Sequence, residues 1–194
     1  MKALIVYCHP SDDSFTRVVR DAFIKCLEES CHSYEISDLY KMHFCADMSE
    51  DEYRREAEYD ETKGLAKDVI EEQSKILRCD FIVFIYPIFW TEAPAKLVGW
   101  FDRVWTFGFA YGAKKMPVLE KCLFLCTAGR SIEHLNEHGH LESMKRVMIG
   151  DRLFGRTKEA MMYVFDGMSK TNPSLRDANW NRHLSKVREI ASTL

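Results

Sequence analysis

Short apolar runs alternate with longer amphipathic segments along this chain. Three runs are almost continuously apolar, at residues 3–8, 81–86 and 122–126. Such runs are typical of strands that are covered on both faces. Two weaker candidates, at residues 33–36 and 161–165, bring the predicted strands to five.

Helical patterns separate these strands, and several carry start signals. Pro94 suits the first position of one helix, and Asn172-Pro173 opens the last. The predicted helices span about residues 15–29, 65–78, 95–106, 140–153 and 175–192. Because right-handed crossovers between parallel strands need an intervening helix, the alternation predicts an α/β fold with a five-stranded parallel sheet and helices on both faces. The simplest such fold is flavodoxin-like, with strand order 2-1-3-4-5, and we expect it to occupy residues 1–194 as a single domain.

Residues 41–63 break this rhythm with many charged side chains and little apolar periodicity. The plain interpretation is a solvated excursion from the fold. The alternative is a flap that covers a binding site.

Composition narrows the class of protein. The net charge is -3 and the basic residues are spread along the chain, so the sequence contains no concentrated basic region that would bind nucleic acid or an anionic membrane. The first apolar run is too short for a signal peptide, and no run approaches the length of a membrane span. Seven scattered cysteines without a Cys-x-x-Cys pair argue against a disulfide framework or a zinc site. We therefore expect a cytoplasmic protein that is not an integral membrane protein.

The loop after the first strand, residues 9–17, has the chemistry of a phosphate site. Free N–H groups and the positive end of a helix dipole meet there, with hydroxyls at Ser11, Ser14 and Thr16. Asp12 and Asp13 oppose this interpretation, because carboxylates compete for the same N–H groups. An ordinary capped helix start is the alternative. The loop has neither a dinucleotide-binding glycine pattern nor a Walker A sequence.

Residues 86–112 form an unusually aromatic stretch that begins where a buried strand ends and holds three of the four tryptophans. Open α/β sheets bind ligands at that position. The turn at residues 126–130 ends the next strand and offers small residues whose backbone a ring can approach closely. Flat side chains and backbone donors together suit a flavin, whose reduced ring carries negative charge.

At this point the sequence resembles the NAD(P)H:quinone oxidoreductases of the DT-diaphorase type and their bacterial relatives. The resemblance covers about the first 140 residues, and it includes His9-Pro10, Glu72-Gln73 and Thr127-Ala128-Gly129. The run from Tyr86 to Tyr111 matches without a gap at Pro87, Trp90, Pro94, Ala95, Leu97, Gly99, Trp100, Phe101, Arg103, Val104, Phe109, Ala110 and Tyr111.

The resemblance implies a flavodoxin-like homodimer with one flavin per subunit. It implies a ping-pong reaction, in which NAD(P)H reduces the flavin and leaves before the acceptor binds. The flavin contacts that it implies are His9, Ser14, Phe15, Thr16, Pro87, Ile88, Phe89, Trp90, Thr127, Ala128 and Gly129. Tyr111 would reach into the partner's pocket.

Some positions depart from the family pattern. Thr91 stands where many relatives have an aromatic, and Ala128-Gly129 followed by Arg130 replaces a Gly-Gly pair. Relatives place a Tyr and a His after this turn, and the spacing here points to His134 and His140 for the substrate pocket. Of these, His140, together with Tyr111, is the candidate catalytic residue.

Other residues have plainer interpretations. Trp100, Phe101, Val104 and Trp105 recur at helical spacing and are expected in the core or a dimer contact. We interpret Cys8 and Cys126 as small buried hydrophobes. The histidines of residues 134–140 lack supporting carboxylates or cysteines, so we predict a solvated loop or substrate contact and no metal.

The leading hypothesis is an FMN-dependent NAD(P)H oxidoreductase that passes hydride to quinones or similar two-electron acceptors. The alternative is a flavodoxin-like ancillary subunit that binds flavin and acts through a protein partner. FMN is favoured over FAD because no adenosine site is recognisable, although Asp102 stands where some relatives place an acidic adenosine contact. For the dimer, we expect a second subunit to cover an apolar surface around Trp105, Phe107 and Phe109.

Overall fold

The computed structural model describes residues 1–113 and 115–194. In this part of the chain, five parallel strands form one sheet in the order β2-β1-β3-β4-β5. The strands are β1 (Lys2–Tyr7), β2 (Ser33–Asp38), β3 (Phe81–Pro87), β4 (Leu119–Thr127) and β5 (Thr157–Phe165). The predicted flavodoxin-like fold and strand order are confirmed.

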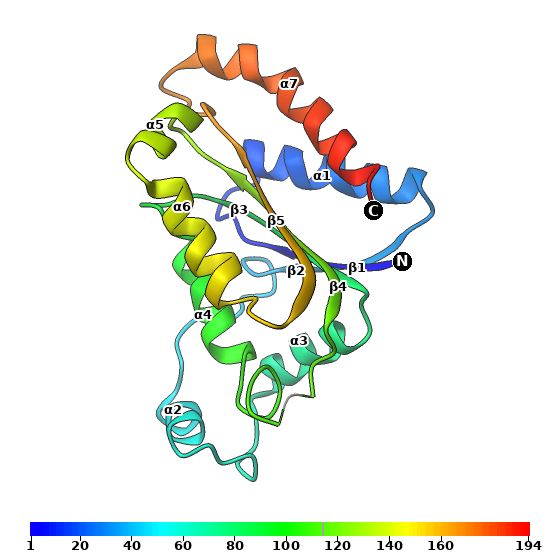
Figure 1. The fold of residues 1–194 in the computed structure, drawn as a ribbon, viewed down its shortest axis with the longest axis vertical. Helices are drawn as coiled ribbons and strands as arrows, with labels where there is room; N and C mark the ends of the chain where they lie inside the picture. The colour runs from blue at the N-terminus through cyan, green and yellow to red at the C-terminus, as the bar shows by residue number, and fades with distance from the viewer. Residues whose placement is uncertain (114) are drawn as a thin grey trace.

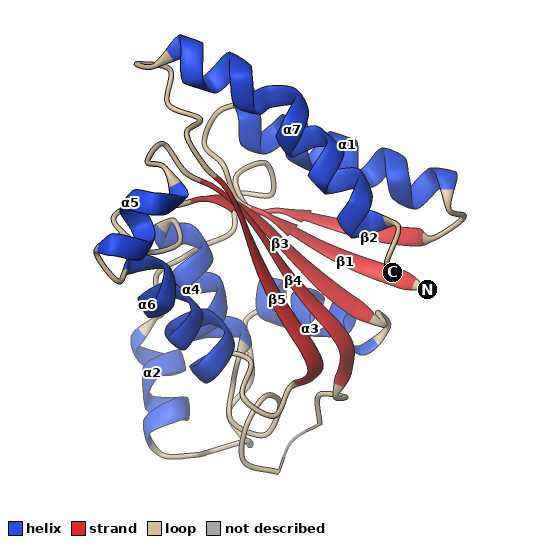
Figure 2. Cartoon of the chain, turned by 45° about the horizontal axis from the view of Figure 1, so that its top comes forward, coloured by secondary structure: helices blue, strands red, loops and turns tan. Residues whose placement is uncertain are grey.

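Helices cover both faces of the sheet (Figure 1). One face carries α1 and α7, whereas α3, α4 and α6 lie against the other (Figure 2). The helices are α1 (Phe15–Glu29), α2 (Glu50–Ala57), α3 (Lys67–Leu77), α4 (Ala95–Val104), α5 (Ile132–Glu137), α6 (His140–Lys145) and α7 (Pro173–Ala191), with a π-helix, η1 (Arg146–Asp151), directly after α6.

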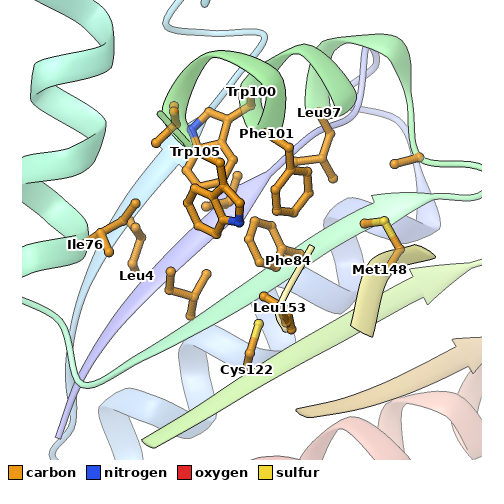
Figure 3. Close-up of a cluster of buried hydrophobic side chains, with 14 of the residues drawn as sticks. Leu4, Ile76, Phe84, Leu97, Trp100, Phe101, Trp105, Cys122, Met148 and Leu153 are labelled. Atoms are coloured by element: carbon orange, nitrogen blue, oxygen red, sulfur yellow. The ribbon is translucent and has the colours of Figure 1, made fainter. Parts of the chain in front are cut away.

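The alternation of side chains along the strands builds two cores. Leu4 and Val6 of β1 point to the α4 side, and Ala3 and Ile5 point to the α1 side. Figure 3 shows the α4 side, where Phe84 of β3 meets the aromatic residues of α4. The expectation that the aromatic residues at helical spacing belong to the core is confirmed, since Trp100, Phe101, Val104 and Trp105 are all buried.

That burial corrects the expected dimer surface. Trp105 is 9% exposed and Phe109 is 5% exposed within the single chain, and Phe107 is half-buried. The indole of Trp105 donates a hydrogen bond to the carbonyl of Arg152 (2.7 Å). The prediction of an apolar surface at these residues was therefore wrong, because the chain covers them itself.

Two segments differ from the predicted helices. The helix expected at residues 140–153 is divided into α6 and the π-helix η1, and α5 precedes it at residues that were predicted as loop. Within the acidic segment, Ser49 and Glu52 form a capping box that starts α2.

Most of the acidic segment is exposed, as a solvated excursion would be, but it is firmly anchored. The guanidinium of Arg103, which is 5% exposed, donates to Glu52, to Asp68 and to the carbonyl of Cys45. Arg55 is also buried and donates to the carbonyl of Phe107. The segment is therefore an arm fixed to the end of α4.

No helix in residues 1–113 and 115–194 is long and apolar enough to cross a membrane.

Replacing Arg103 should detach this arm. In Arg103→Met the carboxylates of Glu52 and Asp68 lose their shared partner, so the free energy of unfolding should fall by about 3 to 5 kcal/mol. Arg54→Met is the matched control: Arg54 is on the same arm, but its ion pair with Glu50 is exposed, and the change should be within about 0.5 kcal/mol. Urea unfolding measures both, and equal losses would refute the anchor.

The same clamp predicts a dependence on pH. Burial raises the pKa of Glu52 and Asp68, but the hydrogen bonds and charge of Arg103, together with hydrogen bonds from Ser49 to Glu52 and from backbone N–H groups to Asp68, outweigh it and hold both pKa values below the ordinary range. The clamp therefore stabilises the fold fully above the ordinary carboxyl pKa, and this stabilisation is lost as the pH falls through the lower folded values. Between about pH 5 and about pH 3, wild type should lose more stability than Arg103→Met does. Parallel losses in urea titrations at the two pH values would contradict this.

Candidate functional site

The loops that follow β1, β3, β4 and β5 gather at the carboxyl end of the sheet (Figure 2) and enclose a cavity of about 400 Å³. Its lining is His9, Ser11, Asp13, Ser14, Phe15, Thr16, Pro87, Ile88, Phe89, Thr127, Ala128, Gly129, Met168, Ser169, Lys170 and Arg176. The structure thus brings together every residue predicted to contact the cofactor except Trp90.

The first loop presents donors to this cavity. The side chain of Ser14 caps α1 by accepting from the N–H of Arg17 (3.1 Å). The N–H groups of Ser14, Phe15 and Thr16 donate to no other group in the described part of the chain. They therefore remain available to an anion at the start of a long helix.

Two aspartates were predicted to compete for these donors, but the structure pairs both elsewhere. Asp12 binds the guanidinium of Arg17 (2.9 Å) and does not line the cavity. Asp13 lines it, and its carboxylate is bound by Lys170 (2.7 Å).

His9 lines the same end of the cavity. Its Nδ1 lies within hydrogen-bond distance of both the N–H (3.0 Å) and the carbonyl oxygen (2.9 Å) of Ser11, so this contact orients the ring and is compatible with either tautomer. Burial, followed by the charge of Lys170, lowers the pKa of His9. The ring is therefore neutral near pH 7.

Thr127 joins the loops across the site. Its hydroxyl shares a buried hydrogen bond with the hydroxyl of Thr16 (2.7 Å), and its carbonyl accepts from the N–H of Ile88 (2.8 Å). The loop after β5 is joined next to it, because the carbonyl of Ala128 accepts from the N–H of Met168 (2.9 Å). Each wall of the cavity is thus held through the end of β4.

Phe89 begins a tight turn at the mouth of the cavity. Phe89 and Glu92 exchange both backbone hydrogen bonds (2.9 Å each), and the two residues between them, Trp90 and Thr91, have φ values of 51° and 65°. Positive φ at both central positions matches a type I′ turn, a strained conformation for a β-branched residue. Arg152 holds the base of the turn through Glu92 (3.2 Å).

A second pocket of about 290 Å³ adjoins the cavity and shares Ile88, Ala128 and Gly129 with it. Its other lining residues are Trp90, Thr91, Arg130, His134, Leu135 and His140. Trp90, predicted at the cofactor edge, therefore lies on this pocket, and its side chain is 100% exposed.

Both histidines predicted for a substrate pocket line this second pocket. The rings of His134 and His138 lie 4.2 Å apart, and His140 lies 6.2 Å from His134, as centroid distances. Burial first, and then the charges of His138, Arg130 and His140, lower the pKa of His134. In residues 1–113 and 115–194, no group of histidines, cysteines and carboxylates has the arrangement of a metal site.

Tyr111 lies apart from both pockets. Its hydroxyl donates to Glu56 on the acidic arm (2.6 Å), and the same carboxylate oxygen accepts from the N–H of Phe107 (2.7 Å). Burial and then Glu56 raise the pKa of Tyr111. Within one chain, the structure does not bring Tyr111 to His140.

Sequence reasoning missed the wall contributed by the loop after β5 and by α7. Arg176 lies over the ring of Trp180 (4.9 Å), and its Nε is buried without a hydrogen-bond partner among the described residues. Lys170 and Arg176 flank the predicted start of α7, but the family resemblance had faded before these positions. Their basic character beside Asn172-Pro173 was the one available signal.

Cys8 and Cys126 lie at the ends of β1 and β4, close to the site. Both are fully buried, and burial raises the pKa of each thiol to about 12. Neither is a thiolate at neutral pH, in agreement with their interpretation as small hydrophobes.

Comparison with known proteins agrees with this architecture. Residues 1–189 match the family model described as a flavodoxin-like fold, and the chain belongs to this family. The solved structure of an NAD(P)H:quinone oxidoreductase from Methanothermobacter marburgensis is 43% identical to it, with a TM-score of 0.89, covering 98% of this chain and 96% of that one. The resemblance to this group of proteins is thereby confirmed.

Two named relatives match over a shorter stretch. A ribosyldihydronicotinamide dehydrogenase-like protein from Penicillium crustosum is 36% identical over 124 residues, which are 58% of this chain and 46% of the relative. An NAD(P)H dehydrogenase [quinone] 1 from Cavia porcellus is 33% identical over 124 residues, 57% of this chain and 45% of the relative. The chain thus spans less than half the length of these relatives in the match.

The joint at Thr127 can be tested by a double-variant cycle. Thr127→Val leaves the buried hydroxyl of Thr16 without a partner, so the free energy of unfolding should fall by about 1 to 3 kcal/mol. Combining it with Thr16→Val removes both polar groups and should recover part of the loss. Chemical denaturation of the variants measures the coupling; strictly additive losses would show that the hydroxyl pair does not join the loops.

Proposed function

We propose that this chain is a flavin-dependent NAD(P)H oxidoreductase that reduces quinones or similar two-electron acceptors. The observation that carries the proposal is the cavity at the carboxyl end of β1, β3 and β4, which gathers the residues that the family resemblance implies. The 43% identity to a quinone oxidoreductase over nearly the whole chain supports the same function.

The residues present fit a flavin phosphate at one end of the cavity. Three N–H groups at the start of α1 are without partners in the described chain, and the buried Nε of Arg176 is also unsatisfied. A buried polar atom without a partner is costly, and a phosphate oxygen would satisfy it. Lys170 lines the same cavity, with its charge paired to that of Asp13.

The other end fits a flat ring. Pro87, Ile88 and Phe89 form one wall, and Ala128 and Gly129 form another. The N–H of Gly129 donates to no group in the described chain, so it is free to face a ring carbonyl. The side chains of Ala128 and Gly129 are small enough for a ring to approach their backbone closely.

A flavin bound here would supply the hydride chemistry, taking hydride from NAD(P)H and delivering it to the acceptor in a ping-pong sequence. The chain itself would bind and orient the partners. His134, neutral near pH 7, can donate a hydrogen bond from its ring N–H to a substrate carbonyl in the second pocket, and His140 lines the same pocket. These roles rest on position and electrostatics.

We also propose a homodimer. Phe89 is 45% exposed and Trp90 is 100% exposed beside the cavity, and a second copy would cover them. Tyr111, held by Glu56 at the end of the acidic arm, would then contribute to the partner's pocket. We propose FMN as the flavin, since Asp102, the candidate adenosine contact, lines neither pocket. Light scattering and mass spectrometry of the released flavin test these two proposals.

The decisive experiment for function is stopped-flow mixing of the flavin-loaded protein with NADH or NADPH. Rapid bleaching of the flavin absorbance, followed by recovery on adding menadione, is expected. Slow or absent bleaching would favour the alternative function, an ancillary flavin-binding subunit. A protein whose spectrum and melting temperature do not change with added FMN or FAD would refute both.

Arg176 provides a specific test of the phosphate end. Arg176→Gln should weaken FMN binding by about tenfold, since it removes a charge-assisted hydrogen bond. The affinity for riboflavin, which has no phosphate, should barely change. Arg188→Gln, which removes the same charge from an exposed position on the same helix, is the control and should bind FMN like wild type. Isothermal titration of the apoprotein measures all three; equal losses for FMN and riboflavin would argue against a phosphate contact.

A further inference from the structure

The polar side chains that line the second pocket are unusually one-sided in charge. Arg130, His134 and His140 contribute to the lining, and no carboxylate does. The chain as a whole has the opposite balance, with a net charge of -3. The pocket beside the candidate flavin site is therefore locally basic.

Arg130 supplies a fixed positive charge there. In the described part of the chain its guanidinium forms no hydrogen bond or ion pair, whereas Arg17, Arg103 and Arg152 all bind carboxylates. Its backbone is anchored, because its carbonyl accepts from the N–H of Gly167 (3.0 Å). The backbone of this residue is thus fixed between the ends of β4 and β5, while its exposed charged group has no protein partner among the described residues.

His134 assists without carrying this charge. The pKa of His134 is lowered by burial and by the surrounding positive groups, so its ring is a neutral hydrogen-bonding group near pH 7. Glu137 opposes that shift from outside the pocket and does not neutralise its lining. Arg130 is therefore the permanently charged group of this pocket.

The same pocket suits a flat molecule. Trp90 lines it with a ring that is fully exposed within the single chain, on a turn with two positive φ values. The second pocket is thus lined by an indole that no other part of the chain covers and by an arginine without a protein partner. A planar ring that carries an anionic group matches both.

We propose that the second pocket selects ring substrates that carry an anionic group, and that Arg130 recognises this group. The inference rests on the proposed function and adds a substrate class to it. Sulfonate, carboxylate and phosphate share the required chemistry, and a guanidinium binds each with paired hydrogen bonds. The anion can belong to the acceptor, as in a sulfonated quinone, or to the donor, as in the additional phosphate of NADPH.

The experiment compares matched substrates in the flavin-loaded enzyme. Arg130→Gln should lower kcat/KM for 1,4-naphthoquinone-2-sulfonate, or for NADPH, by about tenfold, the loss of one strong ion pair. Menadione, the matched neutral quinone, should change by less than about twofold, a difference within the range of surface charge effects. NADH, which shares every charged group of NADPH except the additional phosphate, should change equally little. A loss confined to the sulfonated quinone assigns the anion to the acceptor, and one confined to NADPH assigns it to the donor.

Two further variants sharpen the result. Arg130→Lys keeps the charge without the planar fork and should recover part of the preference. Arg146→Gln removes a positive charge from an exposed residue nearby that does not line the pocket, and it should leave the preference unchanged. Equal losses for charged and neutral substrates in Arg130→Gln, or the same loss in Arg146→Gln, would overturn the proposal.

Reduction of menadione by wild type distinguishes a failure of the anion proposal from a failure of the proposed function. If wild type binds flavin and reduces menadione but Arg130→Gln shows no selective loss, the anion proposal fails and the proposed function stands. If wild type reduces no quinone with either donor, the proposed function fails. Binding of the sulfonated quinone to the oxidised, flavin-loaded protein, followed by its difference spectrum, then still tests Arg130 without turnover: the proposal expects weaker binding in Arg130→Gln, and equal binding would refute it.

Discussion

The site depends on the end of β4, where one short segment joins the walls of the cavity by hydrogen bonds. Thr127 reaches the loop after β1 through its hydroxyl and the loop after β3 through its carbonyl. Ala128 joins the last residue of β5 through its N–H, and the loop after β5 through its carbonyl. Parallel strands bring their carboxyl ends to one edge of the sheet, but this segment fixes how the loops meet there. Its small side chains also leave the space for a ring.

Much of this arrangement could be predicted from the sequence, because it follows from patterns among neighbouring residues. Buried strands with continuous apolar runs, such as residues 81–86, can be recognised without knowledge of the rest of the chain, and their alternation with helices limits the topology. The residues at the strand ends then follow from the topology. This explains why the cavity gathers Ser14 and Gly129, which are far apart in the sequence.

The remaining features depend on contacts between distant parts of the chain, which no local pattern reveals. A single guanidinium, Arg103, binds Glu52 at a separation of 51 residues and turns a charged excursion into an arm. Arg176 lines the cavity from α7, and the helical pattern of α7 does not predict that this residue lies beside the cavity. The position of Trp90 depends on a turn with two positive φ values, and no glycine marks that turn in the sequence.

Because Trp90 is exposed in the chain, its fluorescence can report on binding at the second pocket. Within a single chain, Trp100 and Trp105 are buried and Trp180 lies half-buried beneath Arg176, so the emission of Trp90 in a monomer should be the most red-shifted of the four indoles. A ring that enters the second pocket would displace water from this indole and quench it, while the buried indoles keep their environment. Intrinsic fluorescence can therefore follow ligand entry at the turn, and its covering by a second copy, without an added label.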